Sequence, residues 1–212
     1  MPDTDTRAQP SALKTVRLFL WAAVALAAVV LAVLLLRPGA DRPVQPGLPG
    51  FTLGGPFTLT GADGKPFSST ELQGKPYAVF FGFTNCPDVC PNTLARMARL
   101  RQQLGEGEDA FQIVFVTVDP ERDTPAAVGA YAKLFDTPII GLTGSRAEID
   151  RVAKQFATYQ AKVPQADAPG GYTMDHGAAV LLFDRDGKFV STIAQEEADG
   201  PALDKLRRIT TA

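Results

Sequence analysis

Two cysteines with three residues between them are the most chemically informative feature of the sequence. Cys86 and Cys90 are the only cysteines in the 212-residue chain. The apolar run 78–83 precedes them and Pro91 opens a helical pattern after them, so they are predicted to lie between a strand and a helix. Unpaired N–H groups and the positive end of the helix dipole favour thiolate over thiol there. Thiolates exchange disulfides and bind soft metals, and the spacing leaves both chemistries open.

The single histidine, His176, is the candidate third member of the site. It precedes the apolar run 178–183, and in a thioredoxin-like domain the loop entering this strand packs against the thiol loop. Two thiolates and an imidazole form a soft three-ligand set, which suits Cu(I) and, through the imidazole, Cu(II). Structural zinc takes four protein ligands, and the chain offers no third Cys or second His. Catalytic zinc with an open position stays an alternative.

Each of these residues also has a purely structural interpretation. The cysteines would then form a disulfide that closes a very small loop and adds little stability. His176 would be a turn residue bonded to a backbone carbonyl. We favour a functional site, because the fold brings the loop of His176 to the thiol pair.

The elements that must position these residues are a β-hairpin followed by strands and helices. The hairpin is predicted around Asp63 and Gly64. Near-continuous apolar runs predict buried strands, and apolar residues at helical spacing predict the helices. The expected elements after the hairpin are strands at 77–83, 113–118 and 139–142, helices at 91–104, 125–135 and 147–159, a second hairpin at 178–193 and a last helix at 203–209.

This order of elements is βαβ followed by ββα, with extra elements in front and in the middle. A thiol pair at the first junction of strand and helix is the thioredoxin arrangement. Ligands of such open sheets bind at the carboxyl ends of the strands, where Cys86 and Cys90 lie. The predicted fold class is α/β, a thioredoxin-like fold with an N-terminal hairpin extension, preceded by a single transmembrane helix.

Hydropathy separates a membrane anchor from one outer domain. Residues 18–36 contain no charge, Pro or Gly and are long enough to span a bilayer as a helix. A cleaved signal peptide is the alternative, but the run is longer than usual, and Arg37-Pro38 follow it in place of a small-residue cleavage site. The predicted organisation is a cytoplasmic tail at 1–17, a transmembrane anchor at 18–36, a Pro- and Gly-rich tether at 37–50 and the thioredoxin-like domain at 51–212.

Charge distribution indicates the compartment. Basic residues before the span, among them Arg17, favour an N-terminus inside the cell, so the domain lies where disulfides persist. A mitochondrial precursor begins with an Arg-rich, acid-poor stretch, whereas this chain begins with Asp3 and Asp5. We therefore expect a protein of the bacterial inner membrane with its functional domain in the periplasm. The net charge of −2 offers no basic footprint for nucleic acid.

Several motifs, in order, resemble the Sco/SenC proteins. They are residues 81–91 around the cysteines, residues 116–125, residues 141–144, and Asp175 followed by His176. The similarity extends from about residue 49 to the last helix and includes the anchor. It implies a copper metallochaperone that helps assemble the binuclear copper centre in subunit II of cytochrome c oxidase. It also implies that Cys86, Cys90 and His176 are the copper ligands.

Two aspartates are candidates for supporting the site. Asp119, at the end of its strand, either holds the site from outside the ligand set or belongs to a plain helix cap. Asp175 is placed to orient the ring of His176. Members of the family often carry Ser after the histidine, where this chain has Gly177.

Three functions compete at this stage. The first is copper delivery, and the second is reduction of a target's disulfide by the redox pair Cys86 and Cys90, as some members of the family resemble thiol-disulfide reductases. The third is a structural tethered domain. We expect a carrier rather than an enzyme, monomeric, with cytochrome c oxidase subunit II as its partner. Another copper chaperone or a thiol reductant is the expected second partner.

Overall fold

The computed structural model describes residues 12–36 and 52–211. The chain divides into two compact units, Met1–Gln45 and Pro46–Ala212. In the first unit, helix α1 covers Ala12–Leu36 and contains the predicted span 18–36. Within the described residues, no helix meets the length and hydropathy required of a membrane span. The anchor at 18–36 stays a prediction, and the tether predicted at 37–50 lies outside the described residues, as does most of the predicted tail.

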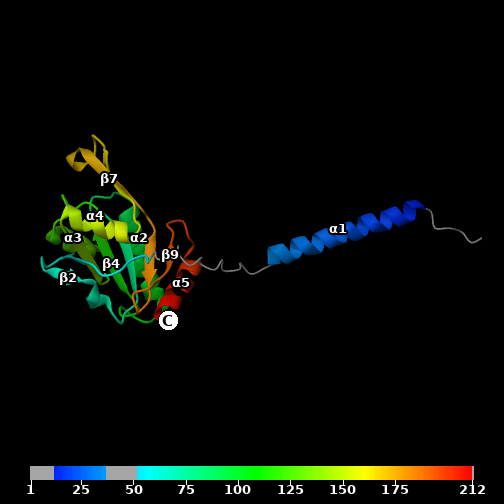
Figure 1. The fold of residues 1–212 in the computed structure, drawn as a ribbon, viewed down its shortest axis with the longest axis horizontal. Helices are drawn as coiled ribbons and strands as arrows, with labels where there is room; N and C mark the ends of the chain where they lie inside the picture. Colours follow the sequence, from blue (N-terminus) through cyan, green and yellow to red (C-terminus); the bar gives the residue numbers. More distant parts are fainter. Residues whose placement is uncertain (1–11, 37–51, 212) are drawn as a thin grey trace, which may run out of the picture. The chain divides into compact units, whose positions relative to one another are not determined.

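The second unit is built on a seven-stranded sheet with the order β2-β1-β5-β4-β3-β8-β9 (Figure 1). Its three middle strands, β5, β4 and β3, are parallel, and the strands on either side of them, β1 and β8, are antiparallel to their neighbours. The strands are β1 Thr58–Gly61, β2 Pro66–Ser68, β3 Tyr77–Gly82, β4 Gln112–Thr117, β5 Ile139–Thr143, β8 Val180–Phe183 and β9 Phe189–Ile193. The predicted hairpins at both ends of the domain are confirmed.

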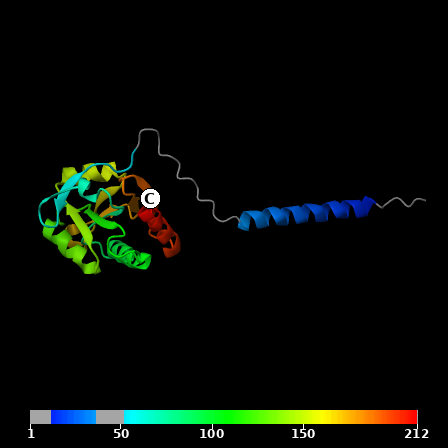
Figure 2. The same cartoon turned by 90° about the horizontal axis from the view of Figure 1, so that it is seen from below.

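Helices cover both faces of this sheet (Figure 2). Helix α2 packs against α5 on one face, and α4 lies on the opposite face. Local sequence sets their ends: α2 stops at Gly105, which adopts the left-handed conformation, and α3 starts after Thr124, whose side chain accepts a hydrogen bond from the Ala127 N–H. The helices are α2 Val89–Leu104, α3 Pro125–Ala132, α4 Arg146–Gln155 and α5 Asp199–Thr211, with short 3-10 turns η1 Ser69–Leu72, η2 Lys133–Phe135 and η3 Pro169–Gly171.

Strand β3 is buried along its whole length, as its apolar run predicts. Because successive side chains of a strand point to opposite faces, Phe80 and Phe81 serve two different core layers. Phe81 packs on Phe156 at the end of α4, with ring centroids 5.6 Å apart. Phe80 packs on Phe115 of β4, whose ring meets Tyr131 of α3. These two layers fix the carboxyl end of β3, where the thiol loop begins.

The sequence interpretation misses a second, two-stranded sheet formed by β6 Gln160–Pro164 and β7 Tyr172–His176. Only one residue of this hairpin, Met174, is buried, so its sequence lacks the apolar run that marks the strands of the main sheet. The helix predicted to end at 159 ends at Gln155, and the chain turns at Ala157 into β6. His176 is therefore the last residue of a strand rather than part of a simple loop.

Candidate metal centre

The thiol loop joins the end of β3 to the first turn of α2. Cys86 lies in the loop and is partly exposed, whereas Cys90 lies in the first turn of the helix and is fully buried. The Cys86 N–H donates to the Phe83 carbonyl at 3.2 Å, and the Cys90 N–H donates to the Cys86 sulfur at 3.4 Å. Both cysteines are free thiols. The free N–H groups of the helix start thus face the Cys86 sulfur, as the sequence predicts.

The position of the Cys90 sulfur depends on a glycine. A Cβ atom at Gly82 would lie 2.8 Å from this sulfur and 3.0 Å from the rings of Phe80 and Phe115. Real Cβ atoms do not approach neighbours so closely. The last residue of β3 is glycine because the buried sulfur occupies the space of its side chain.

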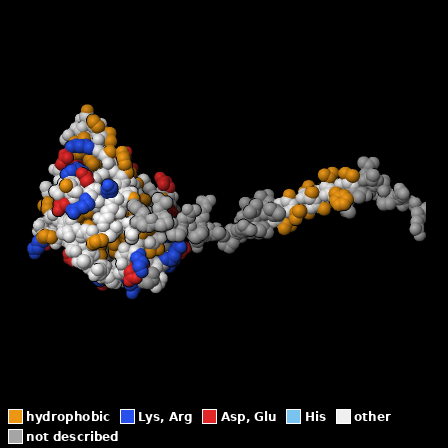
Figure 3. Space-filling model, viewed as in Figure 1, with side chains coloured by type: hydrophobic (Ala, Val, Ile, Leu, Met, Phe, Trp, Pro, Cys, Tyr) orange, Lys and Arg blue, Asp and Glu red, His pale blue; other side chains and the backbone are white. Residues whose placement is uncertain are grey.

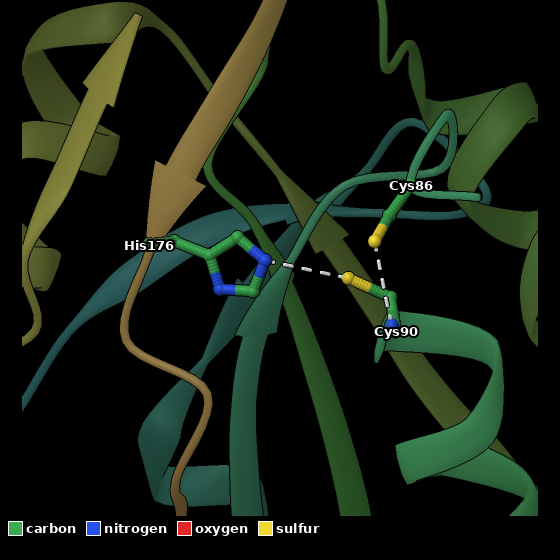
Figure 4. A group of neighbouring side chains, drawn as sticks. All are labelled: Cys86, Cys90 and His176. Atoms are coloured by element: carbon green, nitrogen blue, oxygen red, sulfur yellow. Dashed lines mark hydrogen bonds between the residues drawn. The ribbon is translucent and has the colours of Figure 1, made fainter. Parts of the chain in front are cut away.

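His176 enters from the other side of the site (Figure 4). Its ring stands edge-on to Phe83 and Phe80, with centroids 5.8 Å and 6.0 Å away. Its Nδ1 lies 3.0 Å from the Gly177 carbonyl, which only accepts hydrogen bonds, so Nδ1 carries the proton. The Nε2 atom, which then presents a lone pair, lies 3.5 Å from the Cys90 sulfur. The imidazole is thus held in the tautomer that a metal ligand requires.

The structure brings the three candidate residues together. The two sulfurs and a ring nitrogen of His176 all lie within 4.8 Å of one another. Cys90 and His176 are 86 positions apart in sequence, so the convergence is produced by the fold alone. Two sulfurs and one imidazole nitrogen at these distances form a soft donor set that could hold a metal ion.

The two thiols differ in acidity. A hydrogen bond from the Cys90 thiol is the largest cause that lowers the pKa of Cys86 to about 4. The interaction with the His176 ring and the Cys90 and Asp88 N–H groups reinforce the effect against the opposing influence of burial. The pKa of Cys90 is raised, because its thiol bonds to Cys86 and is buried. At neutral pH the pair is therefore one exposed thiolate and one buried thiol.

Asp123 is a supporting residue that lies in the motif 116–125 and that the sequence does not single out. It is fully buried, and its carboxylate accepts from the Thr84 N–H at 2.9 Å, the Thr84 hydroxyl at 2.5 Å and the Thr117 hydroxyl at 2.5 Å. Thr84 lies two residues before Cys86, so Asp123 holds the thiol loop on the end of β4. The available signal was its place just after a buried strand, inside the motif 116–125.

The two predicted supporting aspartates have different positions. Asp119 is fully buried and accepts from the Tyr172 hydroxyl at 2.9 Å, at the start of the strand that ends in His176. Asp175 is exposed, and the Gly177 carbonyl, instead of this carboxylate, accepts from the His176 ring. A Cβ atom at Gly177 would lie 3.6 Å from the Thr158 side chain, which is an ordinary van der Waals contact. Packing therefore does not require a glycine at this position.

Fold and site together define a class: a thioredoxin-like α/β domain with a dithiol and an imidazole at the carboxyl ends of its central strands. The family model described as SCO1/SenC matches residues 46–211. The chain belongs to the SCO1/SenC family.

Known relatives support the same conclusion. The human mitochondrial SCO1 homolog is 35% identical over 150 residues, which make up 70% of this chain and 50% of that protein. The chain thus matches about half the length of this relative. The structure of Bradyrhizobium japonicum ScoI with copper bound is 43% identical, covers 74% of this chain and 99% of that one, and has a TM-score of 0.67. BsSco is a member of the Sco family of cytochrome c oxidase assembly proteins, and a disulfide switch is described for it. Its structure is 26% identical to this chain with a TM-score of 0.58, and the match covers 76% of this chain and 95% of that one.

The acidity of Cys86 predicts the pH dependence of its alkylation. The rate of reaction with iodoacetamide should stay nearly constant from about pH 8 to about pH 5 and fall only as the thiolate is protonated near its pKa of about 4. In the unfolded chain the pKa of the Cys86 thiol is near 9.0, so the lowered pKa of the folded state also stabilises the fold at high pH. This contribution to the free energy of unfolding declines as the pH falls towards 4. The guanidinium-unfolded protein is the control, and a folded-state rate that falls as steeply below pH 8 as in the unfolded chain contradicts the assignment.

Gly82→Ala tests the packing of the Cys90 sulfur. We expect a loss of about 1–3 kcal/mol in the free energy of unfolding, from overpacking. Displacement of the sulfur also weakens its hydrogen bond to Cys86, so the alkylation profile should move to higher pH. Gly200→Ala is the matched control, since a Cβ there meets nothing within 4 Å. Urea unfolding and alkylation of both variants check the expectation, which fails if the profile of Gly82→Ala matches that of the control.

Proposed function

We propose that the protein is a copper metallochaperone whose cargo binds to Cys86, Cys90 and His176. The observation that carries the proposal is the convergence of two sulfurs and an imidazole nitrogen within 4.8 Å. Thiolates select Cu(I), and the imidazole extends the site to Cu(II). The free lone pair on Nε2 and the exposed Cys86 thiolate supply ligands without a change of fold. The copper-bound relative from Bradyrhizobium supports copper over zinc.

The proposed acceptor is the binuclear copper centre in subunit II of cytochrome c oxidase. Membership of a family that includes cytochrome c oxidase assembly proteins supports this acceptor. Cys86 is suited to handing over the ion, because it is the more accessible sulfur and is ionised at neutral pH. Copper is supplied in turn by another copper chaperone, and a thiol reductant keeps both sulfurs available.

Thiol-disulfide reduction is the second candidate function, and the unequal acidity of the thiols favours it. A reductase needs one attacking thiolate and one thiol that resolves the mixed disulfide. Cys86 has the lowered pKa and the exposure of the first, and buried Cys90 has the position of the second. Closing a Cys86–Cys90 disulfide would release two electrons to the target and remove both sulfur ligands from the metal.

We also propose that the domain is held at the outer face of a bacterial inner membrane by residues 18–36. Helix α1 carries exposed large apolar side chains, among them Phe19, Trp21 and Leu26, and Figure 3 shows hydrophobic side chains along its described part. Apolar groups around a helix favour lipid as their surroundings. A periplasmic location supplies the oxidising surroundings in which the dithiol pair has a redox role.

His176→Ala separates copper delivery from thiol reduction. The variant should keep its fold and still form the Cys86–Cys90 disulfide, because neither depends on the imidazole. Its affinity for Cu(II) should fall by more than roughly 10- to 100-fold, which is the loss typical when a residue that only supports a ligand is removed. Circular dichroism, metal analysis of the reduced and oxidised domain, and cytochrome c oxidase activity in cells measure the three properties. Normal oxidase assembly in His176→Ala cells, together with its abolition by Cys86→Ser, would establish thiol reduction in place of copper delivery.

The membrane anchor is tested by topology. An alkaline phosphatase fusion after Pro49 should be active, and the full-length protein should resist extraction with carbonate. A charged substitution within the span, Ala27→Glu, should weaken retention in the membrane. Release of a shortened soluble form by the wild-type chain would indicate a cleaved signal peptide instead.

A further inference from the structure

Tyr172, the first residue of β7, is clamped by charged groups. The guanidinium carbon of Arg122 lies 3.9 Å from the centre of its ring, and the Lys162 ammonium lies 3.8 Å from the same point. Two cations therefore pack against this one ring. The Tyr172 hydroxyl donates to the fully buried Asp119 carboxylate at 2.9 Å. Both the ring and the polar end of this side chain are therefore held.

Arg122 connects this ring to the rest of the domain. Its Nη1 donates to the carbonyls of Pro169 and Tyr172 at 2.6 Å and 3.0 Å, and its Nε donates to Asp119. Its guanidinium also lies over the ring of Phe83, 5.8 Å from the centre, and that ring packs edge-on against His176. One side chain thus reaches the backbone at the start of β7 and the aromatic surface beneath its end.

The β6–β7 hairpin depends on such side chains for its position. Within the described residues, β7 pairs with β6 and with no strand of the seven-stranded sheet. Figure 1 shows the hairpin projecting from the domain beyond the sheet. The backbone ladder therefore sets the shape of the hairpin but not its placement over the thiol loop. Buried Met174, the Lys162–Glu121 ion pair and the contacts on Tyr172 hold the hairpin on the domain, and those on Tyr172 lie four residues before the imidazole.

We propose that Arg122, acting through Asp119 and Tyr172, is the residue that positions His176 over the two thiols. The inference rests on the proposed function, since the positioned group is the proposed imidazole ligand. Asp123, the next residue, holds the thiol loop through Thr84. Two consecutive side chains of one loop thus set the two halves of the site independently, and Arg122 determines metal affinity without touching the metal.

Arg122→Met tests the proposal, because it keeps much of the apolar stem and removes the charge and the three hydrogen bonds that the side chain donates. Binding of Cu(II) to the reduced full-length protein is measured by titration and by the electron paramagnetic resonance spectrum, in the wild-type and the His176→Ala backgrounds. Tyr172→Phe, which keeps the ring and loses only its bond to Asp119, is a second and milder variant. Arg96→Met is the matched control, because Arg96 is equally buried, at 15% exposed against 16%, and also donates to several carbonyls, none of which belongs to β7.

We expect Arg122→Met to weaken Cu(II) binding about 10- to 100-fold and to alter its spectrum, with a smaller loss in Tyr172→Phe. In the His176→Ala background, neither substitution should weaken binding further, because the positioned ligand is already absent. The control Arg96→Met should lose stability without losing Cu(II) affinity.

Other outcomes overturn specific statements. An equal loss in both backgrounds, or an equal loss in Arg96→Met, would make Arg122 a general structural residue. Unchanged Cu(II) binding in Arg122→Met and Tyr172→Phe, with a loss in His176→Ala, removes only the positioning role. Unchanged Cu(II) binding in His176→Ala by itself removes the proposed ligand set, and the positioning role with it.

Discussion

The buried sulfur of Cys90 is the atom on which the rest of the site depends. It fills the space above Gly82, it hydrogen-bonds to the Cys86 sulfur, and it lies 3.5 Å from the His176 ring nitrogen. Its hydrogen bond to Cys86 and its burial raise its pKa and keep it protonated, and that proton is the largest cause of the lowered pKa of Cys86. The two core layers on either side of β3 hold the end of this strand in place, and they thereby fix the position of the Cys90 sulfur that packs against it. A buried thiol next to an exposed thiolate is an arrangement that both metal transfer and disulfide exchange can use.

The loop between β4 and α3 organises the polar surroundings of that sulfur. Asp119 and Asp123 are both fully buried, and each is satisfied by several donors, as a buried carboxylate must be. Asp123 faces the thiol loop, whereas Asp119 faces the hairpin that carries His176. The loop therefore contacts both the thiol loop and the hairpin that carries His176, although none of its own residues is a proposed metal ligand. Its acidic residues are better explained by these two structural tasks than by capping of α3, which Thr124 performs.

The sequence predicts the parts of this fold that depend on burial and fails where burial is slight. Strand β3, the hairpin at Asp63-Gly64 and the helix after Pro91 follow from apolar runs, turn residues and caps, and the convergence of His176 with the thiols follows from the topology. The β6–β7 hairpin was missed because a projecting pair of strands needs few apolar residues. The role of Asp123 was missed because a buried carboxylate is recognisable only once its donors are known, and these lie on β4 and the thiol loop. Asp175 was a reasonable choice by proximity, but adjacent side chains of a strand point to opposite faces.

The separate two-stranded sheet has a consequence for the energetics of the domain. The thiols belong to the main sheet and its helix, whereas the imidazole belongs to a hairpin with its own hydrogen-bond ladder. An ion shared between Cys90 and His176 is therefore a cross-link between two cooperative units, closing a chain loop of 86 residues. Binding of the ion would therefore oppose local unfolding of the hairpin. By mass action it would raise the free energy of that unfolding by about 2.7 kcal/mol when the free ion is at 100 times its dissociation constant. With the proposed ligands, empty and loaded forms of the protein would differ in how often this hairpin opens, and the proposed acceptor could tell them apart by that difference.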